Sequence, residues 1–336
     1  MIKNLSVLIA IIFSFNTINA QITKIAFGSC AHQDKPQPIL NAVLKDKPSH
    51  FIFLGDNIYG DTDNMDTLKA KYQRYGLKTE FKKLLASTKI MAIWDDHDFG
   101  RNDAGKEYPF KIESKNIFLD FWKEPKNSVR RVQNGLYTSK IITEKNGKKI
   151  QIILLDNRSF RDSLQLSDIK KGDLRDFAIQ KDESKTLLGA EQWIWLEQQL
   201  LIPADIRIVG SSTQFGIEYN GYESWANFPS EQTKMFELIK KTNAKGLFFI
   251  SGDVHYAELS VQKPLGLYPI YDLTSSGITQ TWDFSTDNKY RIGNVCFQNN
   301  YGLVSIDWKN KNVILQVKDI NNKVHIEKQI SFKELK

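Results

Sequence analysis

The sequence lacks several features that would assign it to a special class of protein. Its 336 residues contain two cysteines, Cys30 and Cys296, too few for a fold built on many disulfides. After residue 20 no apolar run is long enough to span a bilayer, and no repeat, low-complexity tract or Pro/Gly/Ser-rich linker interrupts the chain. The net charge is +7, but the arginines do not cluster, so we expect no nucleic-acid-binding surface. These absences leave an ordinary globular chain, long enough to bury a large core.

The N-terminus differs from the rest. Lys3 precedes an apolar stretch from Leu5 to Phe15, and a polar stretch then ends at Ala20. This layout is typical of a secretory signal peptide, and the apolar stretch is short for a bilayer span. We therefore expect cleavage after Ala20, a secreted or periplasmic protein, and one continuous domain over 21–336. The alternative is an uncleaved membrane anchor.

The rest of the chain predicts an α/β fold. Short apolar runs ending in Gly or Asp predict buried strands at 22–28, 50–55, 89–95, 136–142, 150–155, 206–211 and 246–251. Apolar residues at helical spacing predict helices over 65–86, 111–122, 189–201 and 230–241.

From residue 257 the pattern becomes mainly β, with strands expected at 257–263, 268–274, 302–308, 313–319 and 323–331. Two mixed sheets packed face to face and flanked by helices accommodate both halves. The polar segment 159–188 shows no strand pattern, so we expect a long surface loop there.

Acidic and histidine-rich clusters follow three of the predicted strands, in FIFLGDNIYGD (51–61), IMAIWDDHDFGRND (90–103) and FFISGDVHYAE (248–258). Side chains that leave several strand ends at one edge of an α/β sheet point into a shared crevice. So many carboxylates in one crevice would repel each other unless multivalent cations lay among them. The clusters therefore predict a site for more than one metal ion.

Individual residues fit this interpretation to different degrees. The Asp56 carboxylate has two oxygens that can bridge two cations, and the Tyr59 phenolate favours a hard ion such as Fe(III). Asp253 and His255 alternate by two, so both face one side of an extended strand. A Cys30 thiolate is a strong ligand. The alternative for Tyr59 is an ordinary half-buried tyrosine. The alternatives for Cys30 are a small buried thiol and a disulfide with Cys296.

The second cluster offers Asp95 or Asp96 as a metal ligand, and of the two we expect Asp96. His97 is placed to donate a proton or to hydrogen-bond a ligand, and Asn102 offers a neutral oxygen. In LDNRSFRD, Arg158 presents a fork that matches two phosphate oxygens. The alternative to phosphate binding by Arg158 is a surface salt bridge, to Asp156 or Asp162 for example. Gln214, which follows another strand, is expected near the rim of the site.

The order and spacing of these motifs resemble the alkaline phosphatase D family, one of the calcineurin-like metallophosphoesterases with a site related to purple acid phosphatases. The motifs that carry the resemblance are GSC (28–30), GDNIYGD (55–61), WDDHD with Asn102 (94–102), LDNRSFRD (155–162), SSTQF (211–215) and SGDVHYAE (251–258). The resemblance implies a four-layer α/β/β/α sandwich with metals at the sheet ends.

The resemblance also implies roles for single residues. The first metal, Fe(III), would be held by Cys30, Asp56, Tyr59 and His255. The second, often calcium, would be held by Asp56, Asp96 and Asp253, with Asn102 beside it. His97 would aid phosphate binding and departure of the leaving group, and Arg158 would contact the phosphate. Asn57 and Arg101 are further candidates for contacting the substrate.

The function expected from these residues is hydrolysis of phosphate monoesters or diesters, with a metal-bound hydroxide as the nucleophile and a small phosphate ester as the partner. A phospholipase D-like phosphodiesterase acting on lipid or nucleotide diesters is one alternative. A non-catalytic, metal-containing binding module is another, and a structural calcium-binding protein is a third.

Overall fold

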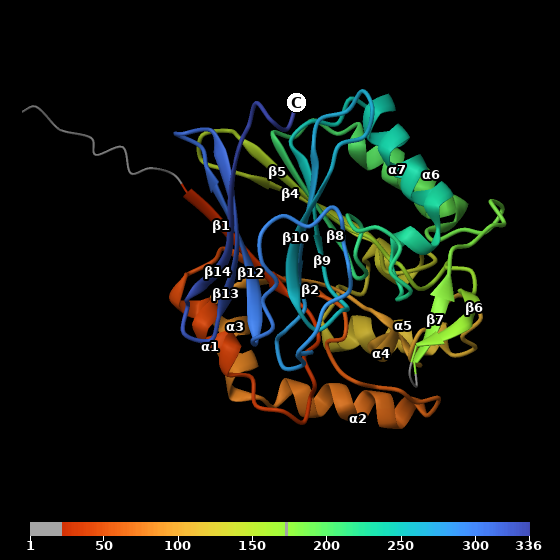
Figure 1. The fold of residues 1–336 in the computed structure, drawn as a ribbon. Coiled ribbons are helices and arrows are strands. Elements are labelled where there is room, and N and C mark those ends of the chain that lie inside the picture. Colours follow the sequence, from red (N-terminus) through yellow and green to blue (C-terminus); the bar gives the residue numbers. More distant parts are fainter. Residues whose placement is uncertain (1–21, 172–173) are drawn as a thin grey trace, which may run out of the picture.

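The structure is a computed structural model that describes residues 22–171 and 174–336. Two six-stranded sheets form its centre (Figure 1). The first sheet has the strand order β14 (Val324–Ser331), β13 (Asn312–Asp319), β12 (Asn300–Asp307), β1 (Ile22–Gly28), β2 (His50–Leu54) and β3 (Lys89–Ile93). The strands β1, β2 and β3 run parallel, whereas β12, β13 and β14 add to β1 in antiparallel fashion.

The second sheet is also mixed. Its strand order is β10 (Ala257–Gln262), β11 (Ile270–Ser275), β9 (Leu247–Ser251), β8 (Ile206–Ser211), β5 (Lys149–Leu154) and β4 (Thr138–Thr143). The four central strands β11, β9, β8 and β5 are parallel, and an antiparallel strand closes each edge. Every residue of β8, β9 and β11 is buried, as expected of strands covered on both faces.

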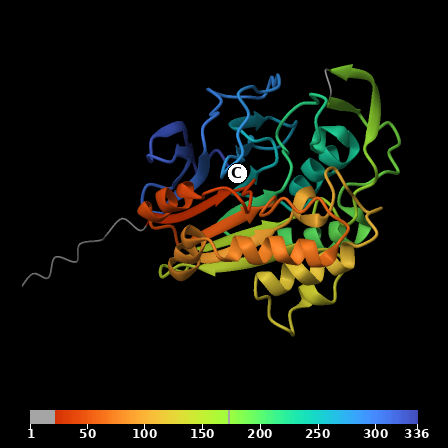
Figure 2. The ribbon, with the colours of Figure 1, turned by 90° about the horizontal axis from the view of Figure 1, so that it is seen from below.

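Helices cover both outer sides of the sheet pair. In the view from below, the orange and yellow helices of the first half of the chain gather on one side, and the teal helix α7 lies on the other (Figure 2). The helices are α1 (Pro38–Lys45), α2 (Met65–Gly76), α3 (Thr79–Ser87), α4 (Asp96–Phe99), α5 (Lys111–Phe121), α6 (Gly189–Leu200) and α7 (Pro229–Lys241), with short 3-10 turns η1 (Val129–Arg131) and η2 (Trp225–Asn227). The expected α/β architecture of two mixed sheets flanked by helices is confirmed.

Two apolar clusters account for the packing. The larger one joins the two sheets to each other and to the N-terminal helices, with Phe27, Phe51 and Phe53 among its members. The smaller one lies under α6 and α7 and contains Phe215 and Phe249. Because the helices and strands bury these faces, the polar ends of the parallel strands are left at the edge of the sheets, where the site is built.

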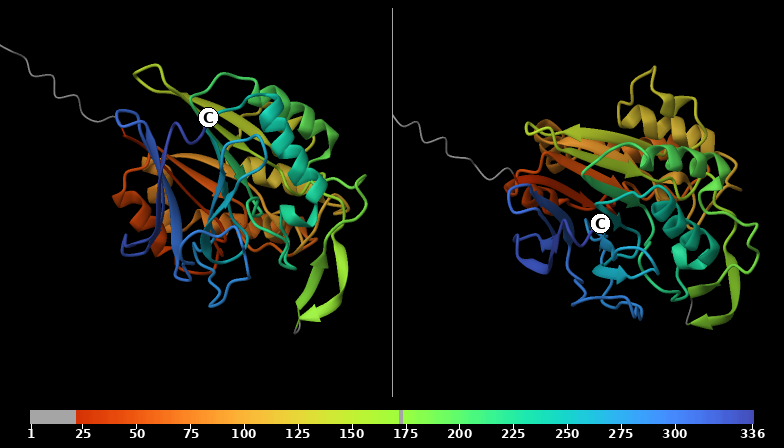
Figure 3. Two further views of the ribbon diagram at one scale, coloured as in Figure 1. Left: turned by 45° about the horizontal axis from the view of Figure 1, so that its top comes forward. Right: turned by 90° about the horizontal axis from the view of Figure 1, so that it is seen from above.

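The expected surface loop over 159–188 is wrong in part. A two-stranded hairpin, β6 (Gln165–Lys171) and β7 (Leu174–Ala178), lies within it and stands out from the body of the fold (Figure 3). Its second strand is tied down where the Phe177 amide donates to the Gly221 carbonyl and the Tyr219 hydroxyl donates to the Phe177 carbonyl. These long-range hydrogen bonds attach the hairpin to the rest of the fold, although its sequence has few apolar residues.

The expected helix over 65–86 is interrupted. Helix α2 ends at Gly76, and Lys78 adopts an extended conformation before α3 begins at Thr79. Among the described residues no helix combines the length and the apolarity that a membrane span requires. The expected signal peptide, 1–20, lies outside the described residues. Cys30 and Cys296 are both free and buried, so the disulfide alternative is wrong.

The smaller cluster offers a test of the packing. The rings of Phe215 and Phe249 stack with centroids 3.8 Å apart, and both are fully buried. Phe249→Ala should lower the free energy of unfolding by about 3–5 kcal/mol, because it removes the ring and leaves a cavity. Urea denaturation measures this loss. Leu265→Ala is the control, because that side chain is 98% exposed and its removal should change little.

Candidate metal centre

The candidate ligands lie where parallel strands end. Cys30 follows β1, Asp56 follows β2, and Asp253 and His255 follow β9. Asp95 and Asp96 follow β3 at the start of the single-turn helix α4. Because parallel strands have their carboxyl ends at one edge, chain segments more than 200 residues apart meet there, as shown by the 3.5 Å contact of the Cys30 thiol with the Asp253 carbonyl.

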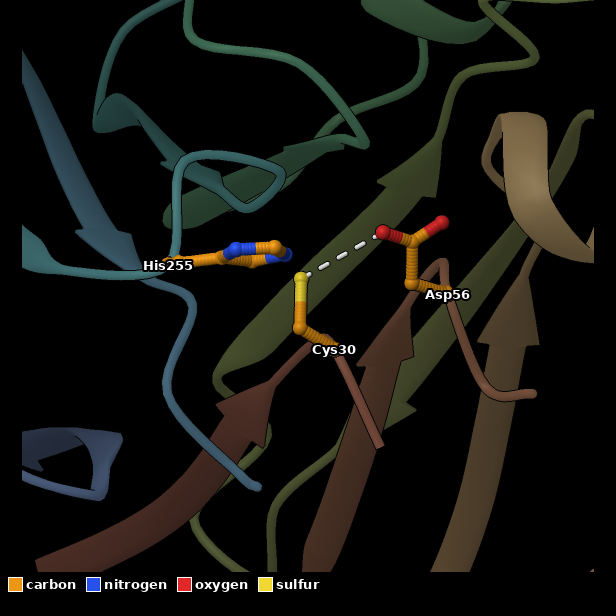
Figure 4. A group of neighbouring side chains, drawn as sticks. All are labelled: Cys30, Asp56 and His255. Carbon is orange, nitrogen blue, oxygen red and sulfur yellow. Dashed lines mark hydrogen bonds between the residues drawn. The ribbon is translucent and has the colours of Figure 1, made fainter. Parts of the chain in front are cut away.

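The first group combines a thiol, a carboxylate and an imidazole. Ligand atoms of Cys30, Asp56 and His255 all lie within 4.8 Å of one another (Figure 4). The Cys30 thiol donates to Asp56 Oδ2 at 3.4 Å. The hydroxyl of Tyr59 lies 2.9 Å from Nε2 of His255. The four residues expected from the sequence to share one metal are therefore neighbours in space.

The second group consists of carboxylates alone. Oxygen atoms of Asp56, Asp95, Asp96 and Asp253 lie within 4.8 Å of one another. Asp56 belongs to both groups, which is the position of a bridging ligand. Both Asp95 and Asp96 are present, so the geometry does not force the choice of Asp96 over Asp95.

Several of these oxygens accept no hydrogen bond from the residues that the structure describes. Asp56 Oδ1, Asp95 Oδ2 and Asp96 Oδ1 are buried without a hydrogen bond among the described residues. An uncompensated buried carboxylate oxygen is costly, and a bound cation removes that cost. The orphaned oxygens and the mixed thiol, phenol, imidazole and carboxylate donors thus fit a pair of metal ions.

The pKa shifts of Asp56, Asp253 and Cys30 also fit a site that binds metal ions. Burial, together with the neighbouring Cys30, raises the pKa of Asp56 well above its ordinary value. Burial and the nearby carboxylates do the same to the pKa of Asp253, and burial raises the pKa of the Cys30 thiol to about 12. Without cations these groups would hold their protons, whereas positive charge in their midst would favour the ionised forms.

The backbone at this edge is unusual. Cys30, Asp56, Asp253 and His255 all have positive φ, at 63°, 49°, 78° and 56°. Non-glycine residues rarely adopt this left-handed conformation, and when they do so they often mark functional sites. Four such residues at one site show that the turns after β1, β2 and β9 are strained in the backbone, and that this strain accompanies the orientation of the candidate ligands.

His97 lies beside the carboxylates but also has its own partner. One of its ring nitrogens is within 4.8 Å of Asp56 and Asp96 oxygens, and Nδ1 lies 2.7 Å from Asp61 Oδ1. Burial alone would lower the pKa of His97, but the carboxylates of Asp56, Asp96 and Asp61 raise it to about 11. The neighbouring carboxylates thus favour the protonated ring, and Asp61 fixes its orientation.

Arg158 is fully buried rather than on the surface. Its guanidinium lies 2.5 Å from Asp95 Oδ1 and 2.7 Å from Glu223 Oε2. The expected alternative, a surface salt bridge to Asp156 or Asp162, is thus wrong. The geometry makes Arg158 a counter-charge within the acidic cluster, and its contact with a phosphate stays a prediction.

Three other expected site residues lie apart from the cluster. Arg101 is exposed and pairs with Asp63 on the surface, and the exposed Asn102 donates its side-chain amide to Asp103. Asn57 is buried, but its amide donates to Asp98 and to the Ile93 carbonyl. Their roles toward metal or substrate stay predictions.

Gln214 is not at the rim as expected, because its side chain is buried and donates to Glu258 and Thr274. Conversely, none of the motifs predicted a role for Glu223, which pairs with both Arg158 and Arg161. The same holds for Ser276, whose hydroxyl lies 3.1 Å from the Cys30 thiol and accepts from the His255 amide. Ser276 follows β11, so its position after a predicted strand was a signal that reasoning from the acidic clusters passed over.

The buried ion pairs can be tested without knowing the substrate. Arg158→Met should lower the free energy of unfolding by about 3–5 kcal/mol, because it leaves Asp95 and Glu223 buried without their cation. Arg101→Met, which removes an exposed pair, should have little effect. Urea denaturation of the metal-loaded proteins compares the two. Equal losses would contradict the assignment of Arg158 as the counter-charge.

Comparisons with known proteins agree with this geometry. Residues 127–289 match the model of the family described as PhoD-like phosphatase. The alkaline phosphatase D of Bacillus subtilis (strain 168) is 23% identical over 290 residues, covering 75% of this chain and 48% of that protein. The chain thus spans about half the length of this curated relative.

Solved structures share the fold. A structure of PhoD superposes with a TM-score of 0.68 at 18% identity, covering 93% of this chain and 72% of that one. GAP50, the anchor in the inner membrane complex of Plasmodium, follows with a TM-score of 0.57 at 12% identity, over 92% of this chain and 89% of the other. A dimetal phosphatase from Danio rerio has a TM-score of 0.52 at 10% identity, over 92% and 99%. The resemblance inferred from the motifs is confirmed: residues 127–289 match the PhoD-like phosphatase family model, and the fold is shared with the structure of PhoD.

Proposed function

We propose that the protein is a metal-dependent phosphoric ester hydrolase. The observation that carries this proposal is the sharing of Asp56 between two adjacent donor groups at the carboxyl edge of the sheets. One shared carboxylate between two ion sites is the arrangement that lets two cations act on one phosphoryl group. The match of residues 127–289 to the PhoD-like phosphatases supports the same activity.

The donor chemistry supports particular metals. Thiolate, phenolate and imidazole donors from Cys30, Tyr59 and His255 suit Fe(III), and the all-carboxylate group suits a hard divalent ion such as calcium. When bound, two such ions would neutralise the phosphoryl oxygens and activate water for attack.

The protein's own residues would position the substrate and move a proton. Asp61 holds Nδ1 of His97 at 2.7 Å, which leaves Nε2 as the nitrogen available to the substrate. The carboxylates of Asp56, Asp96 and Asp61 raise the pKa of His97 against the effect of its burial, which favours the protonated ring. His97 is thus suited to donate to the departing oxygen of the ester. Arg158 would act indirectly, by holding Asp95 in place.

A non-catalytic role is the rival from another class. The fold alone does not decide the matter, because GAP50 of Plasmodium, described as an anchor, shares it. The donor groups favour the enzyme, because a merely structural protein has no need of several strained, buried ligand side chains around one shared carboxylate. Monoester and diester hydrolysis, including phospholipase D-like action, use the same groups, so substrate choice requires measurement.

We also propose that the protein is exported and that its mature form begins at Gln21. The basic, apolar and small-residue order of residues 1–20 supports this proposal. Sequencing the N-terminus of the protein recovered outside the cytoplasm tests it. A mature protein that still begins at Met1 would contradict cleavage.

Metal content and turnover test the function directly. We expect purified protein to contain iron and a second, divalent cation, and to be violet to yellow from charge transfer between phenolate or thiolate and iron. It should hydrolyse nitrophenyl phosphate, bis-nitrophenyl phosphate or both, and their rates separate monoesterase from diesterase action. A colourless, iron-free and fully active preparation would refute the iron assignment, and a metal-loaded protein inert toward both esters would refute the hydrolase.

The shared carboxylate offers a sharper test. Asp56→Asn should reduce kcat/KM by about 10³-fold or more, because the neutral amide cannot bridge two cations and several kcal/mol of transition-state stabilisation is lost. Elemental analysis should show both ions depleted. Asp63→Asn is the matched control, since this aspartate lies on the surface in its pair with Arg101. A variant that keeps both metals and full activity would exclude Asp56 as the bridge.

A further inference from the structure

A group of aromatic side chains lies directly beside the candidate metal centre. The indole of Trp282 contacts the ring of His255 edge to face, with centroids 5.2 Å apart. Phe284 stacks on Trp282 at 5.0 Å and 5°, and Tyr222 lies 5.5 Å from the same indole. We call Tyr222, Trp282 and Phe284 the aromatic wall.

The wall lies outside the two apolar clusters, and its one contact with a fully buried ring is that of Trp282 with Tyr256, with centroids 6.3 Å apart, among the described residues. None of its three members belongs to either apolar cluster of the described residues or packs against one. Phe284 is 44% exposed, although large apolar side chains gain free energy by burial. Aromatic rings held outside the core beside a reactive centre are a usual feature of ligand sites.

The position of the wall is fixed relative to the candidate ligands. The Trp282 amide donates to the His255 carbonyl at 2.9 Å, and the Thr279 amide donates to the Cys30 carbonyl at 3.0 Å. The Thr279 hydroxyl donates to that carbonyl as well. The segment that carries Trp282 and Phe284 is thus bonded to the backbone of two candidate metal ligands, so the wall is held in place before any substrate arrives.

A hollow of about 510 Å³ is lined by two members of the wall, Tyr222 and Phe284. Its volume is in the range of small-ligand sites. The charged residues that line it, Glu218 and Asp287, are acidic, and no lysine or arginine is among the lining residues. The hollow therefore disfavours a second phosphate or another anion and suits an uncharged group.

We propose that the aromatic wall binds an aromatic ring in the organic part of the phosphate ester, such as an aryl group or a nucleobase. This rests on the proposed hydrolase function and names its substrate class. With the phosphoryl group beside His255, an organic group two or three bonds long reaches Trp282, and the ring then packs against the wall toward the hollow. Stacking of this kind does not depend on charge and favours rings over alkyl chains of equal length.

The test uses non-hydrolysable phosphonates, each as the free acid and as its monomethyl ester, so it does not depend on turnover or on a preference for monoesters or diesters. Calorimetry on the metal-loaded protein should show 2-phenylethylphosphonate binding roughly ten-fold more tightly than ethylphosphonate. In Phe284→Ala this preference should fall to about two-fold or less while the affinity for ethylphosphonate stays the same, and Trp282→Leu should lower the preference as well. Leu265→Ala, which removes an exposed apolar side chain at the β10–β11 turn, should keep the preference.

The outcomes separate the two proposals. If ethylphosphonate binds but the phenyl group adds nothing, the aromatic wall is overturned and the hydrolase stands. If 2-(trimethylammonio)ethylphosphonate binds more tightly than the phenyl compound, the hollow selects a cation and the assignment of an aromatic ring is overturned. If no phosphonate binds, the proposed function fails and the aromatic wall fails with it.

Discussion

Mutual repulsion among buried carboxylates is the constraint on which the rest of the site depends. Asp56, Asp95, Asp96 and Asp253 lie within a few ångströms of one another, with some oxygens unpartnered. The protein places Arg158 against Asp95 and His97 beside Asp56 and Asp96, and these two side chains do not offset the whole group, since Arg158 also pairs with Glu223. Bound cations would supply the positive charge that the carboxylates still lack. The left-handed turns after the strands hold the carboxylates together at a cost in backbone strain.

Much of the fold could be predicted from the sequence because its strands are short apolar runs that end in polar turns. The strands β2, β8 and β9 begin and end within a residue of their predicted bounds. The hairpin β6–β7 was missed because its sequence, with charged residues in both strands, has no apolar alternation, and distant bonds to Gly221 and Tyr219 stabilise it. The short helices α1 and α4 are too brief to show a helical period.

The site could be predicted where chemistry and strand position coincide. Cys30, Tyr59 and His255 each follow a predicted strand and carry an uncommon ligand type, and they are neighbours in space. The sequence did not predict that Arg158 is buried between Asp95 and Glu223, because both partners are over 60 residues away in the chain. Arg101 and Asn102 reach the surface after α4, and their expected roles toward substrate and metal stay predictions.

The pairing of β1 with β12 has a consequence for how the protein is made. Ile22 pairs with Asp307 and Phe27 with Gly302, so the strand that leads to Cys30 finds one of its neighbours almost 300 positions later. Such distant pairing is slow to form, since a very long loop must close first. During synthesis one side of β1 stays open until nearly the whole chain has left the ribosome. The unpaired N–H and C=O groups on that side of β1 must be kept from pairing with other nascent chains throughout that interval.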